Sequence, residues 1–313
     1  MRIFVAGATG AIGRRLVPLL VAAGHDVTAT TRTPAKVQSL RASGAEPVVV
    51  DGLDADAVTD AVTSAKPEIV MHQLTALSGP PNLRRFDDYF AETSRLRTEG
   101  TDNLLRAARA AGTRRVLVQS YAGWSSERSG SPVKTETDPL DPHPTAASRR
   151  TVAAQRYLES TVTAATDIEG VVLRYGGLYG PGTSVGEGGE LLTMIRRRML
   201  PIVGGGTGIW SFVHVDDAAA ATVLAIDHGT SGLYNIVDDD PAPVAEWLPY
   251  LADAIGAPRP LRLPAWLARP LIGAHGISMM TVIRGASNAK ARRELGWTPS
   301  YPSWRQGFAH GLA

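Results

Sequence analysis

Short runs of apolar residues alternate with longer segments of helical periodicity through the first half of the chain. The short runs predict strands and the longer segments predict helices, because buried strands are brief whereas amphipathic helices repeat every three to four residues. Strands that alternate with helices are typical of βαβ units, which predicts an α/β fold with a doubly wound parallel sheet. The predicted strands are 3–6, 26–31, 47–50, 68–72, 115–120 and 170–174, and the predicted helices are about 11–23, 34–42, 54–64, 85–111 and 145–164.

The pattern changes after residue 175, where Gly and Pro become dense through 176–189 and again at 204–208. These residues favour loops over regular elements, so we expect a smaller C-terminal lobe to begin here. Two later runs, 211–215 and 233–237, have strand character and are expected to rejoin the main sheet. We therefore assign residues 1–175, with a returning segment at about 209–237, to the sheet domain, and residues 176–208 and 238–313 to the lobe.

Composition excludes several classes of function. The 313 residues are 44% apolar and 20% charged, which is typical of a soluble protein with a sizeable core. A net charge of +2 and scattered basic residues argue against a nucleic-acid partner. The chain has no cysteine and no metal-binding histidine spacing, so we expect no thiol chemistry and no bound metal. No segment reaches the ~20 apolar residues of a membrane-spanning helix, and we expect a cytoplasmic protein with no membrane partner.

A glycine-rich segment joins the first predicted strand to the first predicted helix and reads Gly-Ala-Thr-Gly-Ala-Ile-Gly. Glycine lets the backbone turn tightly and lets a pyrophosphate approach the main-chain amides. The N-terminus of the following helix offers free N–H groups and a positive dipole end to the phosphates. The segment therefore predicts a dinucleotide-binding turn, although an ordinary glycine-rich turn is the alternative. The predicted cofactor contacts here are Gly7, Thr9, Gly10, Ala11, Ile12 and Gly13.

The end of the second strand bears on which dinucleotide binds. A carboxylate about 20 residues after the glycines would accept a hydrogen bond from the ribose 2′-hydroxyl of NAD. The chain has Thr30-Thr31-Arg32 there instead. Arg32 can pair with the 2′-phosphate of NADP(H), and Arg14 can add a second charge. The expected cofactor is NADP(H); a solvated turn arginine is the alternative for Arg32.

Further motifs follow along the chain: Asp51-Gly52-Leu53, His72-Gln73-Leu74-Thr75-Ala76, and segments 99–105, 173–175, 179–182, 212–217 and 290–297. In this order they resemble the extended and atypical short-chain dehydrogenases/reductases, the relatives of NAD-dependent epimerases and dehydratases. The resemblance covers nearly the whole chain and implies a Rossmann sheet with a smaller C-terminal substrate lobe. It also implies further cofactor contacts from Asp51, Gly52, Leu53, Gln73, Leu74, Thr75, Gln119, Ser120 and Tyr175.

The chain departs from the resembled family at its catalytic pair. Family enzymes carry Tyr-x-x-x-Lys, in which the lysine charge lowers the tyrosine pKa so that the phenol exchanges a proton near neutral pH. None of the eight tyrosines here has a lysine four residues later. The corresponding positions are Ala147 and Thr151. The cofactor motifs are therefore present while the usual proton-transfer pair is missing.

Other polar groups stand near the expected reaction site. Ligands of open α/β sheets bind beyond the carboxyl ends of the strands, where Ser120 and Tyr121 follow the fifth strand. We expect Ser120 to hold a substrate oxygen and Tyr121, which falls about where the family has its catalytic Ser or Thr, to exchange a proton. Lys134 lies in the loop that follows. It is either a solvated surface lysine or a catalytic group that binds an anionic substrate or shifts the pKa of Tyr121.

The expected function is hydride transfer between NADP(H) and a small organic substrate, by an oxidoreductase or an epimerase-like enzyme. The missing pair leaves two alternatives open: a non-catalytic NADP(H) sensor, and a non-redox lyase or cyclase on the same fold. The resemblance also implies a homodimer that packs through the helices at about 85–111 and 145–164, whose faces are rich in alanine.

Overall fold

A parallel sheet of seven strands forms the centre of the computed structural model, which describes residues 1–77, 79 and 82–313. The strand order is β12-β7-β5-β4-β1-β2-β3, and every neighbouring pair is parallel. The carboxyl ends of all seven strands therefore lie along one edge of the sheet. The strands are β1 (Arg2–Ala6), β2 (Asp26–Thr31), β3 (Glu46–Val49), β4 (Ile69–His72), β5 (Arg115–Tyr121), β7 (Glu169–Tyr175) and β12 (Gly232–Ile236).

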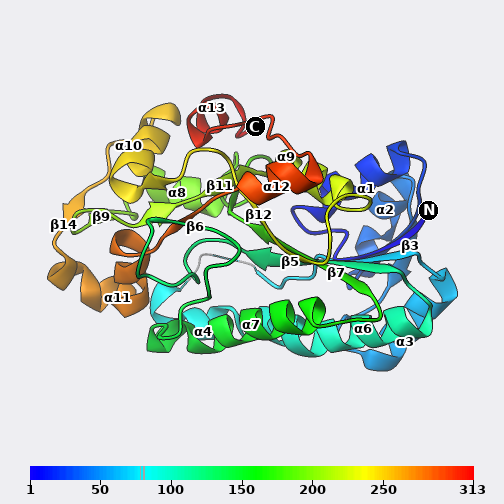
Figure 1. The fold of residues 1–313 in the computed structure, drawn as a ribbon. Coiled ribbons are helices and arrows are strands. Elements are labelled where there is room, and N and C mark those ends of the chain that lie inside the picture. Colours follow the sequence, from blue (N-terminus) through cyan, green and yellow to red (C-terminus); the bar gives the residue numbers. More distant parts are fainter. Residues whose placement is uncertain (78, 80–81) are drawn as a thin grey trace.

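Helices cover both faces of this sheet (Figure 1). Successive residues of a strand point to opposite faces, so each strand contributes to two cores. On β5, Leu117 packs into a core with residues of α1, α2 and α9, whereas Val116 packs into a core with residues of α3, α6 and α7. The doubly wound α/β fold is confirmed. These helices are α1 (Gly13–Ala22), α2 (Val37–Ala42), α3 (Ala55–Ala65), α6 (Thr101–Ala110), α7 (Arg149–Thr163) and α9 (Val215–Leu224).

The six strands predicted in the first half are all present and shift by two residues at most. The prediction for 233–237 is also confirmed, since β12 pairs with β7. The prediction that 211–215 rejoins the main sheet is wrong. Its strand, β11 (Phe212–His214), pairs instead with β8 (Gly177–Tyr179) in a separate parallel pair. The position beside β7 is taken by β12, and an apolar pattern indicates a strand without indicating its partner.

The segment predicted as one helix at about 85–111 is divided into several pieces. After α4 (Phe86–Tyr89) and α5 (Ala91–Arg95) the chain forms a π-helical turn, Leu96–Gly100, before α6 begins. Gly100, the last residue of this turn, lies next to Gly52: a Cβ on Gly100 would be 3.7 Å from the carbonyl oxygen of Gly52. π-Helical turns are uncommon and occur mostly near functional sites. Here the turn brings α5 toward the ends of β2 and β4.

The later part of the chain builds a second core beside the sheet. Tyr179, Phe212, Trp247, Trp304 and Phe308 are among its buried members. This core joins helices and short strands from the second half of the chain. They are α8 (Glu190–Arg196), β9 (Ile202–Val203), β10 (Ile209–Trp210), β13 (Ala242–Pro243), α10 (Val244–Ala254), β14 (Arg262–Leu263), α11 (Ala265–Thr281) and α13 (Trp304–His310).

Two short elements connect the lobe to the loop after β5. β15 (Gly285–Ala286) pairs in parallel with β6 (Val133–Lys134), and α12 (Ala289–Leu295) packs against the sheet core through Ala291 and Leu295. Among the helices of the described residues, none has the length and apolarity that crossing a lipid bilayer requires.

Candidate active site

Two glycines of the turn after β1, Gly7 and Gly13, stand where no side chain would fit. Gly7 has a φ of +92°, and a Cβ there would lie 2.5 Å from the carbonyl oxygen of Gln73. A Cβ on Gly13 would lie 2.5 Å from the carbonyl oxygen of Gly7. Only glycine therefore permits the turn to pack against the end of β4 and α1 to start where it does. This close approach of two backbones is what a pyrophosphate-binding turn requires.

Main-chain donors are available at the start of α1. Within the described part of the chain, the amides of Ala11, Ile12 and Gly13 have no hydrogen-bond acceptor, and the first turn of the helix contains no acidic residue. Free amides and a positive helix dipole suit an anion such as a pyrophosphate. Arg14, one residue further, donates to the carbonyl oxygen of Gly182 at 3.2 Å. Arg14 thus joins the glycine turn to the segment after β8.

The end of β2 carries the predicted cation together with a carboxylate from elsewhere. The Thr30 hydroxyl accepts a hydrogen bond from the amide of Gly7 at 3.2 Å. The Arg32 guanidinium forms an ion pair with Glu92 of α5. Reasoning from the sequence missed Glu92, because it lies 60 residues beyond Arg32 and no local motif marks it. The site therefore contains a carboxylate next to the arginine, although β2 itself lacks one.

The segments after β3 and β4 meet as the resemblance implied. The Asp51 carboxylate accepts from the amide of Leu53 at 3.0 Å, and Asn103 of α6 donates to the carbonyl oxygen of Gly52 at 3.1 Å. A Cβ on Gly52 would lie 2.5 Å from Cδ1 of Leu74. These contacts place the predicted cofactor residues after β3 and β4 side by side.

His72 holds the chain after β4 in place. Its Nδ1 accepts from the amide of Leu74 at 3.2 Å, so its Nε2, 3.1 Å from the carbonyl oxygen of Leu96, carries the proton. Burial lowers the pKa of His72 to about 4, and the ring is therefore neutral near pH 7. The neighbouring Gln73 is buried, and its side-chain oxygen has no hydrogen-bond partner in the described residues. A buried amide with a free acceptor, at the end of β4, is suited to contact a bound ligand.

Ser120 and Tyr121 extend from the end of β5 to opposite sides. Ser120 is buried and donates to Glu159 of α7 at 2.6 Å. Glu159 also pairs with Arg174 and accepts from Gln155, whose amide in turn donates to the carbonyl oxygen of Tyr121 at 2.8 Å. The Ser120 hydroxyl thus belongs to a buried polar network beneath the sheet.

Tyr121 packs among aromatic side chains and remains partly exposed. Burial raises the pKa of its phenol, so the group is protonated near neutral pH and can act as an acid rather than as a base. Tyr175, its neighbour on β7, is buried and bonds Thr222 at 2.6 Å and Gln73 at 3.4 Å. Burial raises the pKa of Tyr175 to about 12. Gln119 is partly exposed two residues before Tyr121.

Lys134 is not a solvated surface residue. Only 3% of its surface is exposed, and its Nζ donates to the carbonyl oxygen of Ser129 at 2.6 Å and to Asp138 at 3.1 Å. The interpretation of Lys134 as a solvated surface lysine is therefore wrong, because its side chain is buried and its ammonium group is bonded within the protein. The hydrogen bonds of its ammonium group lie within its own loop and do not include Tyr121.

The two positions at which we expect the catalytic pair, Ala147 and Thr151, make structural contacts. Ala147 packs against the aromatic side chains around Trp124. The Thr151 hydroxyl donates to Asp87 at 2.7 Å, and its amide donates to the same carboxylate oxygen at 2.8 Å. Asp87 in this way satisfies free amides at the start of α7. No ammonium group stands at either position to lower the pKa of a phenol.

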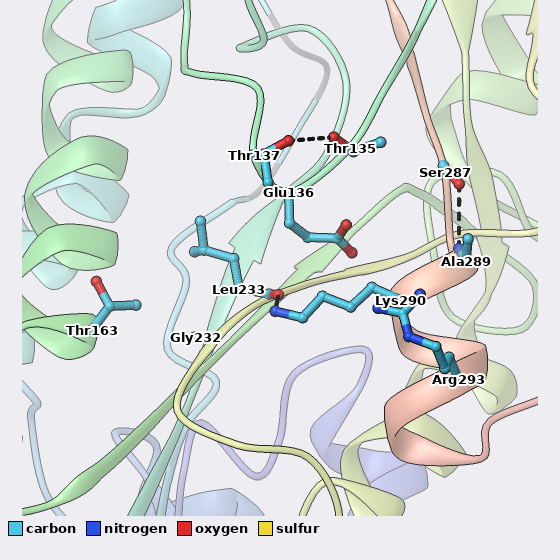
Figure 2. A pocket seen from close by; sticks show the side chains of 10 residues that line it. All are labelled: Thr135, Glu136, Thr137, Thr163, Gly232, Leu233, Ser287, Ala289, Lys290 and Arg293. Carbon is cyan, nitrogen blue, oxygen red and sulfur yellow. Dashed lines mark hydrogen bonds between the residues drawn. The ribbon is translucent and has the colours of Figure 1, made fainter.

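A separate pocket of about 640 Å³ opens beside edge strand β12 (Figure 2). Lys290 donates to the carbonyl oxygen of Leu233 at 2.9 Å, and Glu136 accepts from the amide of Asn235 at 2.8 Å. These side chains satisfy the free backbone groups of an edge strand, which would otherwise pair with another chain. We therefore assign this pocket to protection of the sheet edge. In the described residues, no group of three or more acidic or histidine side chains is placed to hold a metal ion.

The fold and the glycine turn together define a dinucleotide-binding protein of the Rossmann type. The chain belongs to the NAD dependent epimerase/dehydratase family, whose model matches residues 3–237. The resemblance to extended short-chain dehydrogenases/reductases is thereby confirmed. Proteins of this family are epimerases, dehydratases and reductases, so NAD(P)-dependent redox or epimerase chemistry on a small molecule is supported.

Individual relatives agree with this assignment. The chain is 48% identical over 314 residues to the 3-diazoavenalumate denitrifying reductase of a Streptomyces species, which covers 98% of this chain and 99% of the relative. A structure of MoeE5 with UDP-glucuronic acid and NAD is 26% identical, with a TM-score of 0.74 and coverage of 100% and 98%. The human epimerase family protein SDR39U1 with NADPH shares the fold, at 21% identity, a TM-score of 0.75 and coverage of 100% and 99%.

Proposed function

We propose that the protein is an NADP(H)-dependent reductase that transfers a hydride to a small organic acceptor. The observation that carries this proposal is the glycine turn closed against the end of β4, where the amides of Ala11, Ile12 and Gly13 are free to bind a pyrophosphate in the described residues. The reductase relative at 48% identity over nearly the whole chain favours reduction over epimerisation, over a non-redox lyase or cyclase, and over a cofactor sensor. Residues 1–175 and 209–237 would bind the dinucleotide, and residues 176–208 and 238–313 would shape the substrate side.

NADP(H) is proposed because β2 is followed by an arginine at the place where NAD-binding proteins carry a carboxylate. Arg32 ends β2, and Arg14 lies beside the glycine turn. Glu92 pairs with Arg32, but both side chains are about half exposed, so the ion pair contributes only ~0–1 kcal/mol. A 2′-phosphate, with a greater negative charge than a carboxylate, can replace Glu92 as the partner of Arg32.

The chemistry of the acceptor can explain the missing catalytic pair. Carbonyl reduction leaves an alkoxide that must receive a proton, and Tyr-x-x-x-Lys serves that step. When bound, the cofactor supplies a hydride with its electron pair, which would replace the nitrogen of a diazonium acceptor, and that nitrogen leaves as N2. This exchange balances without a proton from the enzyme. A carboxylate that carries an aromatic diazonium group is therefore the proposed acceptor, and the reductase relative is named for a diazo compound.

The chain's own residues would position this acceptor. Tyr121 is partly exposed at the end of β5 and would contact it, with its protonated phenol able to donate a hydrogen bond. Ser120 would act through Glu159 and Gln155, which hold the carbonyl group of Tyr121 in place. Lys134 would contribute a positive charge from the loop above, where Asp138 partly balances it.

A charge change inside the glycine turn tests cofactor binding. Gly10 is the least crowded glycine of the turn: a Cβ there would meet only the carbonyl oxygen of Gly7, at 3.3 Å, a tight contact that a small backbone shift relieves. Gly10→Asp places a carboxylate at the proposed phosphate site, whereas Gly10→Asn has the same shape without the charge. Titration of NADPH fluorescence should show binding to the wild-type protein and Gly10→Asn, and binding weaker by at least ~10-fold in Gly10→Asp.

Turnover is measured with the same protein and an aromatic carboxylate whose diazonium group is labelled with ¹⁵N. Loss of NADPH absorbance should accompany release of labelled N2, above the rate without enzyme. Equal NADPH affinity of the Gly10→Asp and Gly10→Asn variants would contradict the cofactor site. NADPH binding without any oxidation by the diazo compound would contradict the proposed acceptor.

A further inference from the structure

Five aromatic side chains gather beyond the end of β5. We refer to Phe86, Phe90, Tyr121, Trp124 and His275 as the aromatic cluster. The ring centroid of Phe86 lies 4.4 Å from that of Phe90, 4.9 Å from that of Trp124 and 4.1 Å from that of His275. The rings of Tyr121 and Trp124 are 5.5 Å apart. These separations are in the range in which aromatic rings attract each other through their faces and edges.

The cluster draws on three elements that are distant in the sequence. Phe86 and Phe90 come from α4 and its end, Tyr121 and Trp124 from the end of β5, and His275 from α11. In Figure 1, α4 and α11 lie beyond the tip of the β5 arrow, on the side to which the strands point. Substrates of open α/β sheets bind on that side. Phe90 and Tyr121 are the partly exposed members of the cluster, whereas Phe86, Trp124 and His275 are buried.

The cluster also contains polar atoms that have no partner. His275 is 1% exposed, and among the described residues its Nε2 has no hydrogen bond, while its Nδ1 lies 3.2 Å from the Thr145 hydroxyl. Ser278, one turn further along α11, is also buried with an unpaired hydroxyl. Burial lowers the pKa of His275 to about 4, and the charge of Arg128 contributes, so the ring is neutral. Buried polar atoms without partners are rare and call for an explanation.

We propose that the aromatic cluster binds a phenolic ring of the substrate, stacked on Tyr121 and Trp124, with the ring hydroxyl bonded to Nε2 of His275. This inference rests on the proposed reductase function and specifies its substrate class. A phenolic hydroxyl both donates and accepts hydrogen bonds, so it matches either neutral tautomer of His275. The stacked rings supply the apolar contact that an aromatic substrate needs.

The cluster does not suit the sugar nucleotides bound by some structural neighbours. A sugar nucleotide has many hydroxyls and a pyrophosphate, which require several donors and at least one cation. The polar side-chain groups of the cluster are the Tyr121 hydroxyl, the indole N–H of Trp124 and the imidazole of His275, and none of them is a cation near neutral pH. An aromatic acid with one ring hydroxyl uses these few polar groups and the large apolar surface together.

The test is calorimetric titration of the NADP⁺-loaded protein with 4-hydroxycinnamate, cinnamate and UDP-glucose. His275→Phe keeps an aromatic ring and removes its nitrogens, Trp124→Leu removes a stacking surface, and His310→Phe is the matched control at an exposed histidine. The wild-type protein should prefer 4-hydroxycinnamate to cinnamate by ~10-fold, the value of one hydrogen bond. His275→Phe should reduce that preference to about twofold or less, Trp124→Leu should weaken both aromatic probes, and His310→Phe should resemble the wild type.

Three results would overturn the proposal: a wild-type preference below about twofold, a preference that survives in His275→Phe, or tighter binding of UDP-glucose than of 4-hydroxycinnamate. Circular dichroism checks the fold of each variant. If His275→Phe is unfolded, two measurements still test the proposal: the preference of the wild-type protein for 4-hydroxycinnamate over cinnamate, and the affinity of Trp124→Leu for both probes. Failure of the proposed function is seen separately, as absence of NADPH binding. The aromatic probes are then titrated into the cofactor-free protein, where the same criteria apply.

Discussion

Arg32 at the end of β2 and Glu92 of α5 form an ion pair. The arginine attracts a 2′-phosphate, whereas the carboxylate repels it and can accept a hydrogen bond from a ribose 2′-hydroxyl. The two side chains therefore favour different cofactors, and the choice between NADP(H) and NAD(H) depends on which of them the bound dinucleotide contacts.

Cofactor preference should respond to each partner in opposite directions. Arg32→Ala should weaken NADPH binding by ~10-fold and leave NADH binding nearly unchanged, while Glu92→Gln should strengthen NADPH binding by about threefold. Fluorescence titration with both cofactors measures these changes. Glu99→Gln is the matched control, because Glu99 forms an exposed ion pair with Arg95 two turns further along the same helical segment. Tighter binding of NADH than of NADPH to the wild-type protein would contradict the proposed cofactor.

The buried hydrogen bonds and ion pair of Glu159 should contribute more to the free energy of unfolding than an exposed ion pair does. Glu159→Gln leaves Arg174 buried without its counter-charge and should lower the free energy of unfolding by ~3–5 kcal/mol. Ser120→Ala removes one hydrogen bond to Glu159 and should cost ~1–2 kcal/mol. Asp167→Asn, which breaks the exposed pair with Arg109, should cost only ~0–1 kcal/mol. Urea unfolding measures all three, and equal effects of Glu159→Gln and Asp167→Asn would refute the prediction.

Stability should fall as the pH drops from about 6.5 toward 4. His72 and His275 are buried as neutral rings, and burial lowers the pKa of each from 6.5 to about 4. The unfolded chain therefore binds protons first, so their contribution is complete above pH 6.5 and is lost progressively below it. At pH 5, each histidine should lower the free energy of unfolding by ~2 kcal/mol relative to its value above pH 6.5.

Urea unfolding of the wild-type protein and of His275→Phe at pH 7.5 and pH 5 tests this. The variant should lose about half of the pH dependence, because only His72 continues to titrate. The same free energy of unfolding at both pH values would show that the two rings are accessible to protons in the folded protein.

We also predict a homodimer that packs through α6 and α7. Tyr157 lies on this surface, is 40% exposed, and bonds Asp102 of α6 at 2.9 Å. Light scattering should give twice the mass of one chain, and Tyr157→Arg should shift the equilibrium toward the monomer. Tyr250→Arg, a change at a comparably exposed tyrosine on α10, should leave the assembly intact. A wild-type protein that scatters as a single chain at micromolar concentration would contradict the prediction.

The sequence predicted those elements that form because of the properties of neighbouring residues. The apolar runs of β1, β2, β4 and β5 follow from burial on both faces of a parallel sheet, and the runs mark their own positions. The glycine turn was recognisable because Gly7 and Gly13 have a spacing that few other structures require. The motif residues at Asp51 and Leu74 could be assigned only through resemblance to a family.

Tertiary structure alone decided the arrangement of the groups that act together. Glu92 reaches Arg32, and Glu159 reaches Ser120, because α5 and α7 pack beside strands that lie far from them in the sequence. The aromatic cluster likewise joins Phe86 to His275 across 189 positions of the chain. A periodic pattern reports which side of an element is buried and carries no information about which distant side chain will face it. The strands and the glycine turn were thus determined locally, whereas the charge at the proposed cofactor site and the aromatic cluster depend on packing between distant segments.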